Sequence, residues 1–248
     1  MTKPVIYCLD IETAPLLVYA WHLRETPAVP LNMVHTDWSL LSFAAKRLDK
    51  KSMVYRDNRG AKDPRNDRGL MLGLWTVLNE ADIVVGHNLK QFDLKKINAR
   101  FALYDMKPPS PYKAVDTLSE ARKCFAFSSN KLEFLSGKLT NQAKLKHNEF
   151  PGFSLWTECL NSNPRAWRAL ERYNKADVIA TEELYLKLRP WMGTHPHVGI
   201  YVDAPDLCPK CGSAQLQHRG YSTTQAGKYP RLRCNECLGW SRGRKKVA

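Results

Sequence analysis

The chain has 248 residues, of which 44% are hydrophobic, and a formal net charge of +14 at pH 7. This length allows one full domain with an appendage or two small domains. No apolar run reaches the roughly 18 residues of a membrane span, and the first predicted strand begins too early to leave room for a signal peptide. We therefore expect a cytoplasmic protein with no membrane partner, whose seven cysteines are metal ligands or free thiols instead of disulfides.

The first half of the chain predicts strands first and then alternating elements. An apolar run at residues 5–9 predicts a buried strand. A long irregular segment follows, and two further runs predict neighbouring strands of an antiparallel meander at residues 38–45 and 52–55. The remaining predicted elements are, in chain order, a helix capped by Asp67, a strand at 83–86, a helix at 92–103, a strand at 114–117, and helices from Leu118 and near 131–139.

The last long helix has clear signals at both ends. Asn163 is a good cap, Pro164 suits the first helical position, and the pattern runs to Leu188 before Pro190 ends it. The whole order predicts a mixed α/β sheet with helices on both faces. We expect this domain to span residues 1–193, a linker 194–205, and a small C-terminal module 206–248.

Acidic residues occupy positions where a solvent-exposed charge would be unusual. Asp10 and Glu12 follow the first apolar run, and residues i and i+2 of a strand point the same way. Asp177 is seven residues from both Leu170 and Leu184, so it shares the inward stripe of the long helix. Tyr173, four residues earlier, lies on the same face. Buried carboxylates are costly unless something compensates them, and a divalent cation is the usual partner.

Three segments together resemble the DEDD 3′-5′ exonucleases. Residues 9–13 (LDIET) look like the first motif, and residues 86–93 (GHNLKQFD) look like the second motif in the form found in proofreading domains of B-family polymerases. Residues 173–177 (YNKAD) look like the third motif in its tyrosine variant, and Arg172 stands where the related subtype has histidine. Residues 115–118, with Lys131 and Leu132, resemble a further segment. The resemblance covers roughly the first 190 residues, in order.

The resemblance implies an RNase H-like fold and hydrolysis of phosphodiester bonds with two Mg²⁺ or Mn²⁺ ions. Such cations prefer oxygen ligands, which accounts for carboxylates in place of His or Cys. The resemblance assigns metal ligation to Asp10, Glu12, Asp93 and Asp177, and it assigns orientation of the attacking water to Tyr173. Asn88 and Phe92, in the second motif, are candidate substrate contacts.

Several residues also have a purely structural interpretation. Asp93 suits the first turn of a helix, Tyr173 suits a packed helix face, and Asp116 suits a helix start, so we leave Asp116 outside the catalytic set. For His87 we favour a role in loop structure. The sequence leaves open whether three residues of the long segment and the next strand line a substrate groove or pack internally: Trp21, His22 and Trp38.

The C-terminal module contains two Cys-x2-Cys pairs, which are separated by 22 residues. Two such pairs complete a tetrahedral thiolate site, so we expect one structural Zn²⁺ in a zinc ribbon, spanned by a β-hairpin. Its ligands would be Cys208, Cys211, Cys234 and Cys237. About 44 residues cannot build much of a core, so zinc would fold the module.

Basic and aromatic residues gather in the same module. From residue 205 onward nine Lys and Arg face two Asp and Glu. Arg231, Arg233 and Trp240 are candidate contacts to phosphates and bases of a single strand. A zinc ribbon that docks another protein is the alternative.

We therefore expect a metal-dependent 3′-5′ exonuclease acting on DNA, single-stranded DNA in the first place, with RNA as an alternative substrate and a polymerase or repair protein as a potential partner. One rival is a structure-selective endonuclease on the same fold. The other is a non-catalytic module that binds nucleic acid or a replication partner.

Overall fold

A five-stranded mixed sheet forms the centre of the computed structural model, which describes residues 3–22, 29–141 and 149–248. The strand order is β5-β4-β1-β6-β7. β1 pairs antiparallel with β4, β4 antiparallel with β5, and β6 and β7 extend the sheet in parallel. The five strands are β1 (Ile6–Thr13), β4 (Leu40–Arg47), β5 (Met53–Asp57), β6 (Ile83–Gly86) and β7 (Lys113–Asp116). The predicted order of three antiparallel strands followed by alternating helices and strands is confirmed.

The first strand is longer than the apolar run that predicts it. β1 continues beyond residue 9 because its pairing with β4 runs on to Thr13, which lies opposite Leu40. Asp10 and Glu12 are therefore inside the strand, opposite Ala44 and Ser42. The backbone pairing of β1 fixes the position of both carboxylates.

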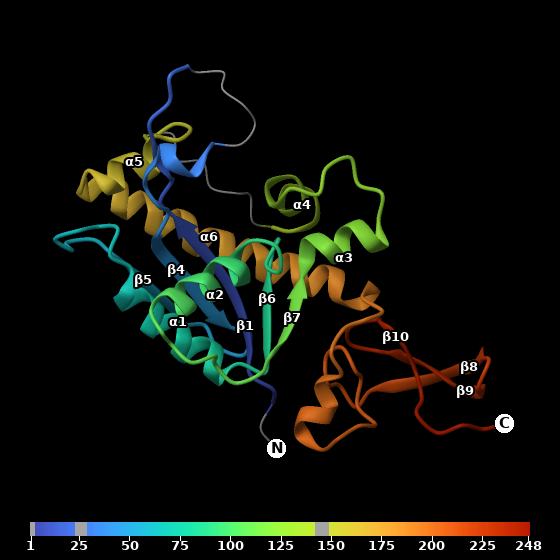
Figure 1. The fold of residues 1–248 in the computed structure, drawn as a ribbon. Helices are drawn as coiled ribbons and strands as arrows, with labels where there is room; N and C mark the ends of the chain where they lie inside the picture. Colours follow the sequence, from blue (N-terminus) through green and yellow to red (C-terminus); the bar gives the residue numbers. More distant parts are fainter. Residues whose placement is uncertain (1–2, 23–28, 142–148) are drawn as a thin grey trace.

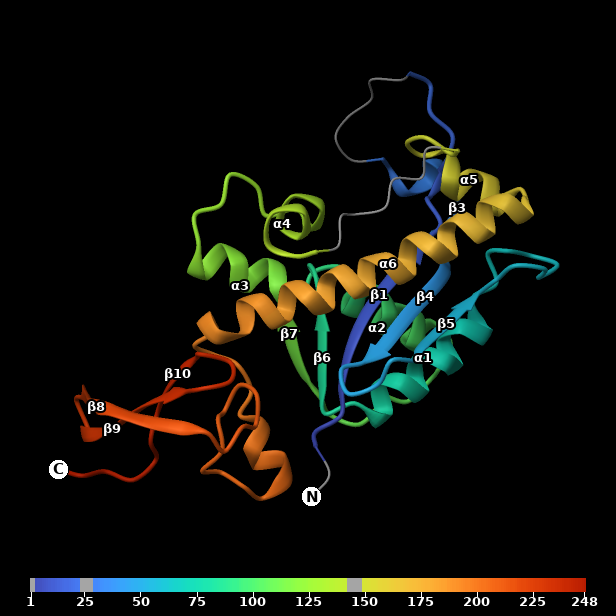
Figure 2. The same ribbon diagram turned by 180° about the vertical axis from the view of Figure 1, so that it is seen from behind.

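Helices cover both faces of the sheet, as Figures 1 and 2 show from opposite sides. Leu9 and Ile11 of β1 face a core cluster shared with α1 and α2, whereas Ile6 and Cys8 face a cluster shared with α6 and its neighbours. Because alternate residues of a strand point to opposite faces, Asp10 and Glu12 lie on the α6 side. The helices are α1 (Arg68–Glu80), α2 (Asp93–Leu103), α3 (Thr117–Cys124), α4 (Leu132–Leu139), α5 (Ser154–Leu160) and α6 (Pro164–Leu188).

The long helix α6 begins as its sequence predicts. The side chain of Asn163 accepts a hydrogen bond from the backbone N–H of Arg165 over 3.0 Å, and Pro164 occupies the first turn. The first half of α6 packs against α5 in a third cluster that includes Leu155, Cys159 and Trp167. Such packing anchors the helix that crosses the sheet beside β1.

Two expectations for the N-terminal half are wrong. Asp67 precedes α1 but does not cap it: its buried carboxylate accepts hydrogen bonds from the backbone of Leu40 at 2.8 Å and from Tyr104 at 2.5 Å, and it pairs with Arg100. A charged tertiary partner outcompetes the local cap. The described part of the segment expected to be irregular contains a small antiparallel sheet of β2 (Leu17–Val18) and β3 (Val34–Thr36), with the short helix η1 (Leu31–Met33).

The C-terminal part lies beyond the end of α6 (Figure 1). The short helices η2 (Arg189–Trp191) and η3 (Val198–Val202) precede a three-stranded sheet. That sheet has the order β10-β9-β8, made of β8 (Leu216–Thr224), β9 (Gly227–Cys234) and β10 (Trp240–Arg242). The buried side chain of Lys210 donates to the carbonyl of Pro190, which ties the cysteine module (residues 206–248) to η2, directly after α6. Among the described residues, no helix has the length and apolar character to cross a membrane.

Candidate metal centres

Two elements bring three carboxylates together. β1 supplies Asp10 and Glu12, and α6, which crosses the same face of the sheet, supplies Asp177. One oxygen from each of these three residues lies within 4.8 Å of the others. Glu12 and Asp177 are buried, at 8% and 5% exposure, so their charges are poorly screened by water. This donor set suits a hard divalent cation, which takes carboxylate oxygens as ligands.

Asp93 lies beside this cluster but outside the group of mutually close oxygens. It is the first residue of α2 and is 3% exposed. Its Oδ1 accepts a hydrogen bond of 3.2 Å from the backbone N–H of Ile11, the residue between Asp10 and Glu12. The structure thus joins the predicted second motif to the first through a direct contact.

The electrostatics of the cluster favour a bound cation. Burial raises the pKa of the Asp10 carboxyl well above its ordinary value, and the three neighbouring carboxylates raise it further. Burial also raises the pKa of Asp93 to about 7, although backbone N–H donors oppose that shift. Carboxylates at this spacing repel one another, and a divalent cation between them would relieve the repulsion.

Two residues that the sequence analysis missed hold the carboxylates. Asn174 is fully buried and donates from Nδ2 to Asp10 Oδ2 over 2.6 Å, while its Oδ1 accepts from Ser42 over 3.1 Å. Trp156 of α5 donates from its indole nitrogen to Glu12 Oε2 over 2.8 Å. Helical spacing could have revealed Asn174, which is three residues before Asp177. No sequence signal links Trp156 to Glu12.

The predicted catalytic tyrosine, Tyr173, lies near the carboxylate cluster. Tyr173 is half-buried, one helical turn before Asp177 on α6, and its ring meets that of Trp156 edge to face with centroids 6.2 Å apart. The structure therefore brings Tyr173 into the neighbourhood of the acids through an aromatic contact.

The loop between β6 and α2 holds the other candidates from the second motif. Asn88 adopts a left-handed backbone with φ of 66°, and its N–H donates to Asp116 over 3.0 Å. Phe92 remains 38% exposed. The ring nitrogens of His87 contact Thr117 and the carbonyl of Asn130, in keeping with its expected role in loop structure. Asp116 also caps α3, in keeping with our leaving it outside the catalytic set.

Of the three residues that could line a groove or pack internally, one packs internally and two are exposed. Trp38 packs against the core cluster beneath α1 and α2, with the ammonium of Lys96 3.7 Å from its ring centroid. Trp21 is 84% exposed, and His22 is exposed as well. Trp38 is therefore a structural residue, and the other two face solvent.

The four cysteines of the C-terminal module converge as predicted. Their sulfur atoms lie within 4.8 Å of one another, with 3.7 Å between Cys208 and Cys237 and 3.6 Å between Cys211 and Cys234. These distances exceed a disulfide bond of about 2.05 Å. Hydrogen bonding from Cys211 lowers the pKa of Cys208 to about 4, whereas the hydrogen bond with Cys208 and burial raise the pKa of Cys211. The shift at Cys208 favours the thiolate that zinc requires. Cys8, Cys124 and Cys159 are free thiols.

Basic and aromatic side chains of the module lie on its hairpin. The guanidinium of Arg231 is 5.2 Å from the ring centroid of Trp240, and Arg233 pairs in register with Trp240 across β9 and β10. Trp240 is 48% exposed. These candidate substrate contacts therefore form one patch, on a sheet separate from the one that carries the acids.

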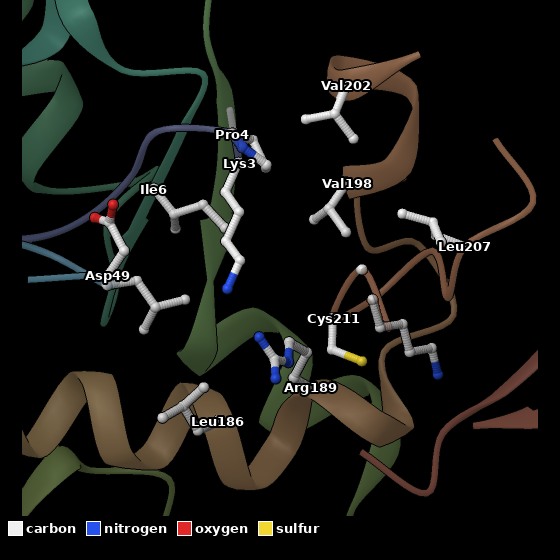
Figure 3. A pocket seen from close by; sticks show the side chains of 13 residues that line it. Lys3, Pro4, Ile6, Asp49, Leu186, Arg189, Val198, Val202, Leu207 and Cys211 are labelled. Atoms are coloured by element: carbon white, nitrogen blue, oxygen red, sulfur yellow. The ribbon is translucent and has the colours of Figure 1, made fainter. Parts of the chain in front are cut away.

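A cavity of about 460 Å³ separates the start of β1 from the cysteine module. Figure 3 shows Lys3 and Arg189 directed into it, with Ile6 and Leu186 on one side and Val198 and Val202 on the other. Ile6 precedes Asp10 by four residues of extended strand, about 13 Å. Of the candidate site residues, only Cys211 lines this cavity, so the cavity is distinct from the acid cluster.

Residues 36–189 match the RNase H superfamily. The chain therefore belongs to the RNase H superfamily, and its mixed sheet carries the fold of that class. The matched span includes Asp93, Tyr173 and Asp177 but begins after β1 and ends before the cysteine module.

Among solved structures, the chain is similar to the family B DNA polymerase from the hyperthermophilic archaeon Pyrobaculum calidifontis. The TM-score is 0.51 and the sequence identity is 16%, over 93% of this chain and 32% of the polymerase chain. The chain thus spans about a third of that polymerase, and at this identity the likeness concerns the fold. A search of curated proteins gives no match.

Proposed function

We propose that this chain is a metal-dependent 3′-5′ exonuclease of the tyrosine-type DEDD group. The observation that carries the proposal is the convergence of Asp10, Glu12 and Asp177, whose oxygens lie within 4.8 Å of one another although they come from β1 and α6. Buried like charges at this spacing weaken a fold unless they bind a cation. The superfamily and the likeness to a family B DNA polymerase agree with a nuclease.

The chemistry follows from the residues in this arrangement. Asp10, Glu12 and Asp177 would hold the cations, with Asp93 as the fourth acid. Two divalent cations, when bound, activate the attacking water and offset the charge that develops on the leaving oxygen. Tyr173 would orient the attacking water with its hydroxyl, beside Asp177 on the same face of α6. Asn174 would fix the direction of the Asp10 carboxylate.

The polarity of cleavage rests on the motif resemblance. Tyr173 four residues before Asp177, with Arg172 in place of histidine, supports the tyrosine subtype. Asn88 and Phe92 are the substrate contacts that we propose near Asp93, and the exposed ring of Phe92 suits stacking on a base.

The cysteine module would assist substrate binding. We propose one structural Zn²⁺ on Cys208, Cys211, Cys234 and Cys237, and phosphate and base contacts from Arg231, Arg233 and Trp240. Basic residues beside exposed aromatic rings suit single-stranded DNA. In this proposal residues 1–193 form the exonuclease domain and 206–248 the zinc ribbon, and the enzyme works in the cytoplasm, alone or beside a polymerase or repair protein.

A gel assay tests the proposal. A 5′-labelled single-stranded DNA and its RNA counterpart are incubated with Mg²⁺, Mn²⁺ or EDTA. We expect a metal-dependent ladder that shortens from the 3′ end and that disappears with Asp10→Asn or Asp177→Asn. Glu133→Ala, which removes an exposed acid on α4, is the matched control and should leave the ladder intact.

Circular single-stranded DNA separates the alternatives. An exonuclease leaves the circle intact, whereas an endonuclease opens it. A salt-sensitive mobility shift without any cleavage of linear or circular substrates would contradict the proposal and favour a binding module.

A further inference from the structure

Trp156 connects two residues of the proposed active site from an element that none of the motifs contains. Its indole N–H donates to Glu12 Oε2 over 2.8 Å. The same ring meets Tyr173 edge to face at 6.2 Å and stacks against Phe153 at 6.4 Å. One side chain of α5 thus contacts a carboxylate on β1 and the tyrosine on α6.

The helix that carries Trp156 is firmly held. Leu155 and Cys159, on the inner side of α5, are both fully buried. They pack with Trp167 and Leu170 of α6 in the third core cluster. Because Trp156 follows Leu155 directly, its ring is placed by a packed core and can hold its partner in one orientation.

The chemistry of the indole suits the support of a metal ligand. Its N–H is only a donor, so it orients a carboxylate without competing as a ligand. The group is neutral and leaves the negative charge of Glu12 available to a cation, whereas Lys or Arg would offset that charge. A carboxylate has about four acceptor sites, so the hydrogen bond from Trp156 does not by itself prevent Glu12 from binding a metal.

We infer that Trp156 is a positioning residue, which orients Glu12 for metal binding and packs against Tyr173. The inference rests on the proposed function, because it assigns a role relative to the metal ligands of that site. Hydrogen bonds to a metal's ligands typically contribute about 10- to 100-fold in metal affinity or activity.

The test measures metal binding separately from catalysis. The full-length chain, loaded with zinc beforehand, is titrated with Mn²⁺ by calorimetry in the absence of nucleic acid. Trp156→Phe keeps an aromatic ring but removes the donor, and we expect it to weaken Mn²⁺ binding about tenfold. In the exonuclease assay the metal concentration that gives the half-maximal rate should rise by the same factor, with KM for DNA little changed.

Trp75→Phe is the matched control. Trp75 also uses its indole N–H, as a donor to the carbonyl of Lys107 over 2.8 Å, and lies on α1, on the opposite side of the sheet from α6. The Trp75→Phe variant should bind Mn²⁺ with the affinity of the wild type. If Trp156→Phe does not fold, replacement by 3-benzothienyl-alanine removes only the N–H and preserves the ring shape, and the same tenfold loss is expected.

The outcomes separate the two proposals. A Trp156 variant that folds and binds Mn²⁺ with wild-type affinity would overturn the positioning role and leave the nuclease proposal intact. The metal site would be overturned if the wild-type chain bound no Mn²⁺, or bound Mn²⁺ equally well after Asp177→Asn. Both proposals would fall with it.

Discussion

Asn174 donates a hydrogen bond of 2.6 Å to Asp10 Oδ2, and the two residues are 164 positions apart in the chain. The amide is fully buried, and its oxygen accepts from Ser42 of β4. A three-residue hydrogen-bonded chain therefore ties β4, α6 and β1 together at the acid cluster. Because both ends of the amide are satisfied by neighbours, its orientation fixes the direction of the Asp10 carboxylate.

Replacement of Asn174 should therefore damage both the site and the fold. Asn174→Ala removes the donor to Asp10 and leaves Ser42 without its acceptor, which should lower kcat about 10- to 100-fold and cost about 1–3 kcal/mol of stability. Single-turnover cleavage and urea unfolding measure the two effects. Asn163→Ala is the control on the same helix: loss of this cap costs about 1 kcal/mol and should leave kcat unchanged. Equal kcat in both variants would contradict the role of Asn174.

The buried His195 should make stability depend on pH. Its Nδ1 donates to the carbonyl of Pro196, and its Nε2 therefore accepts from the hydroxyl of Tyr185 over 2.7 Å. Burial, aided by the charges of Arg189 and Lys210, lowers its pKa from 6.5 to about 4. Between these values the unfolded chain binds a proton that the folded chain does not, so stability falls as pH drops from 6.5 towards 4.

The size of this effect can be measured by difference. Between pH 7.5 and pH 5 the free energy of unfolding of the wild type should fall by about 1–2 kcal/mol more than that of His195→Gln, since only the histidine can gain the proton. Urea unfolding at both pH values gives the comparison, and the variant controls for the carboxylates that titrate in both proteins. A parallel pH dependence of the two proteins would show that the pKa of His195 is the same in the folded and the unfolded chain, and would contradict the prediction.

Removal of zinc should unfold the cysteine module and spare the larger sheet. The module holds two buried cysteines, Cys208 and Cys234, and has no hydrophobic cluster of its own among the described residues, whereas the five-stranded sheet lies between large clusters. We expect one zinc per chain by mass spectrometry of the metal content. Chelation or Cys211→Ser should increase proteolysis of residues 206–248, while residues 29–141 stay protected. Cys124→Ser, which removes a free thiol, is the control. A chelated chain whose module resists the protease as well as the zinc-loaded one would refute the structural role of zinc.

The basic patch of the module should act on substrate affinity. Arg231→Ala and Arg233→Ala should each raise KM for single-stranded DNA, with kcat unchanged, and reduce the salt dependence of binding by about 0.7 per lost phosphate contact. Fluorescence anisotropy at several salt concentrations measures the slope. Lys113→Ala, an exposed cation at the start of β7, should leave the slope unchanged. If the arginine variants behave like this control, the patch serves a different partner.

Much of the fold could be read from local patterns. The apolar runs placed β1, β4, β6 and β7 to within a few residues, and Asn163 with Pro164 marked the start of α6 correctly. Prediction failed where a tertiary partner outcompeted a local one. Asp67 has the sequence context of a cap, but its carboxylate pairs with Arg100, whose guanidinium carries the full opposite charge that a backbone N–H lacks.

The sequence by itself determined the kinds of residue present and their local geometry: Asp10 beside Glu12 on one strand face, Tyr173 beside Asp177 on one helix face, and two Cys-x2-Cys turns. These follow from the periods of strands and helices, which depend only on neighbouring residues. The motif resemblance implied that Asp177 shares a site with Asp10 and Glu12, and the structure brings the three together. Only the tertiary structure decided that Asn174 holds Asp10 and that Trp156 holds Glu12. Contacts between distant segments depend on how helices pack across the sheet, and side chains far apart in the chain carry no local pattern that reports them.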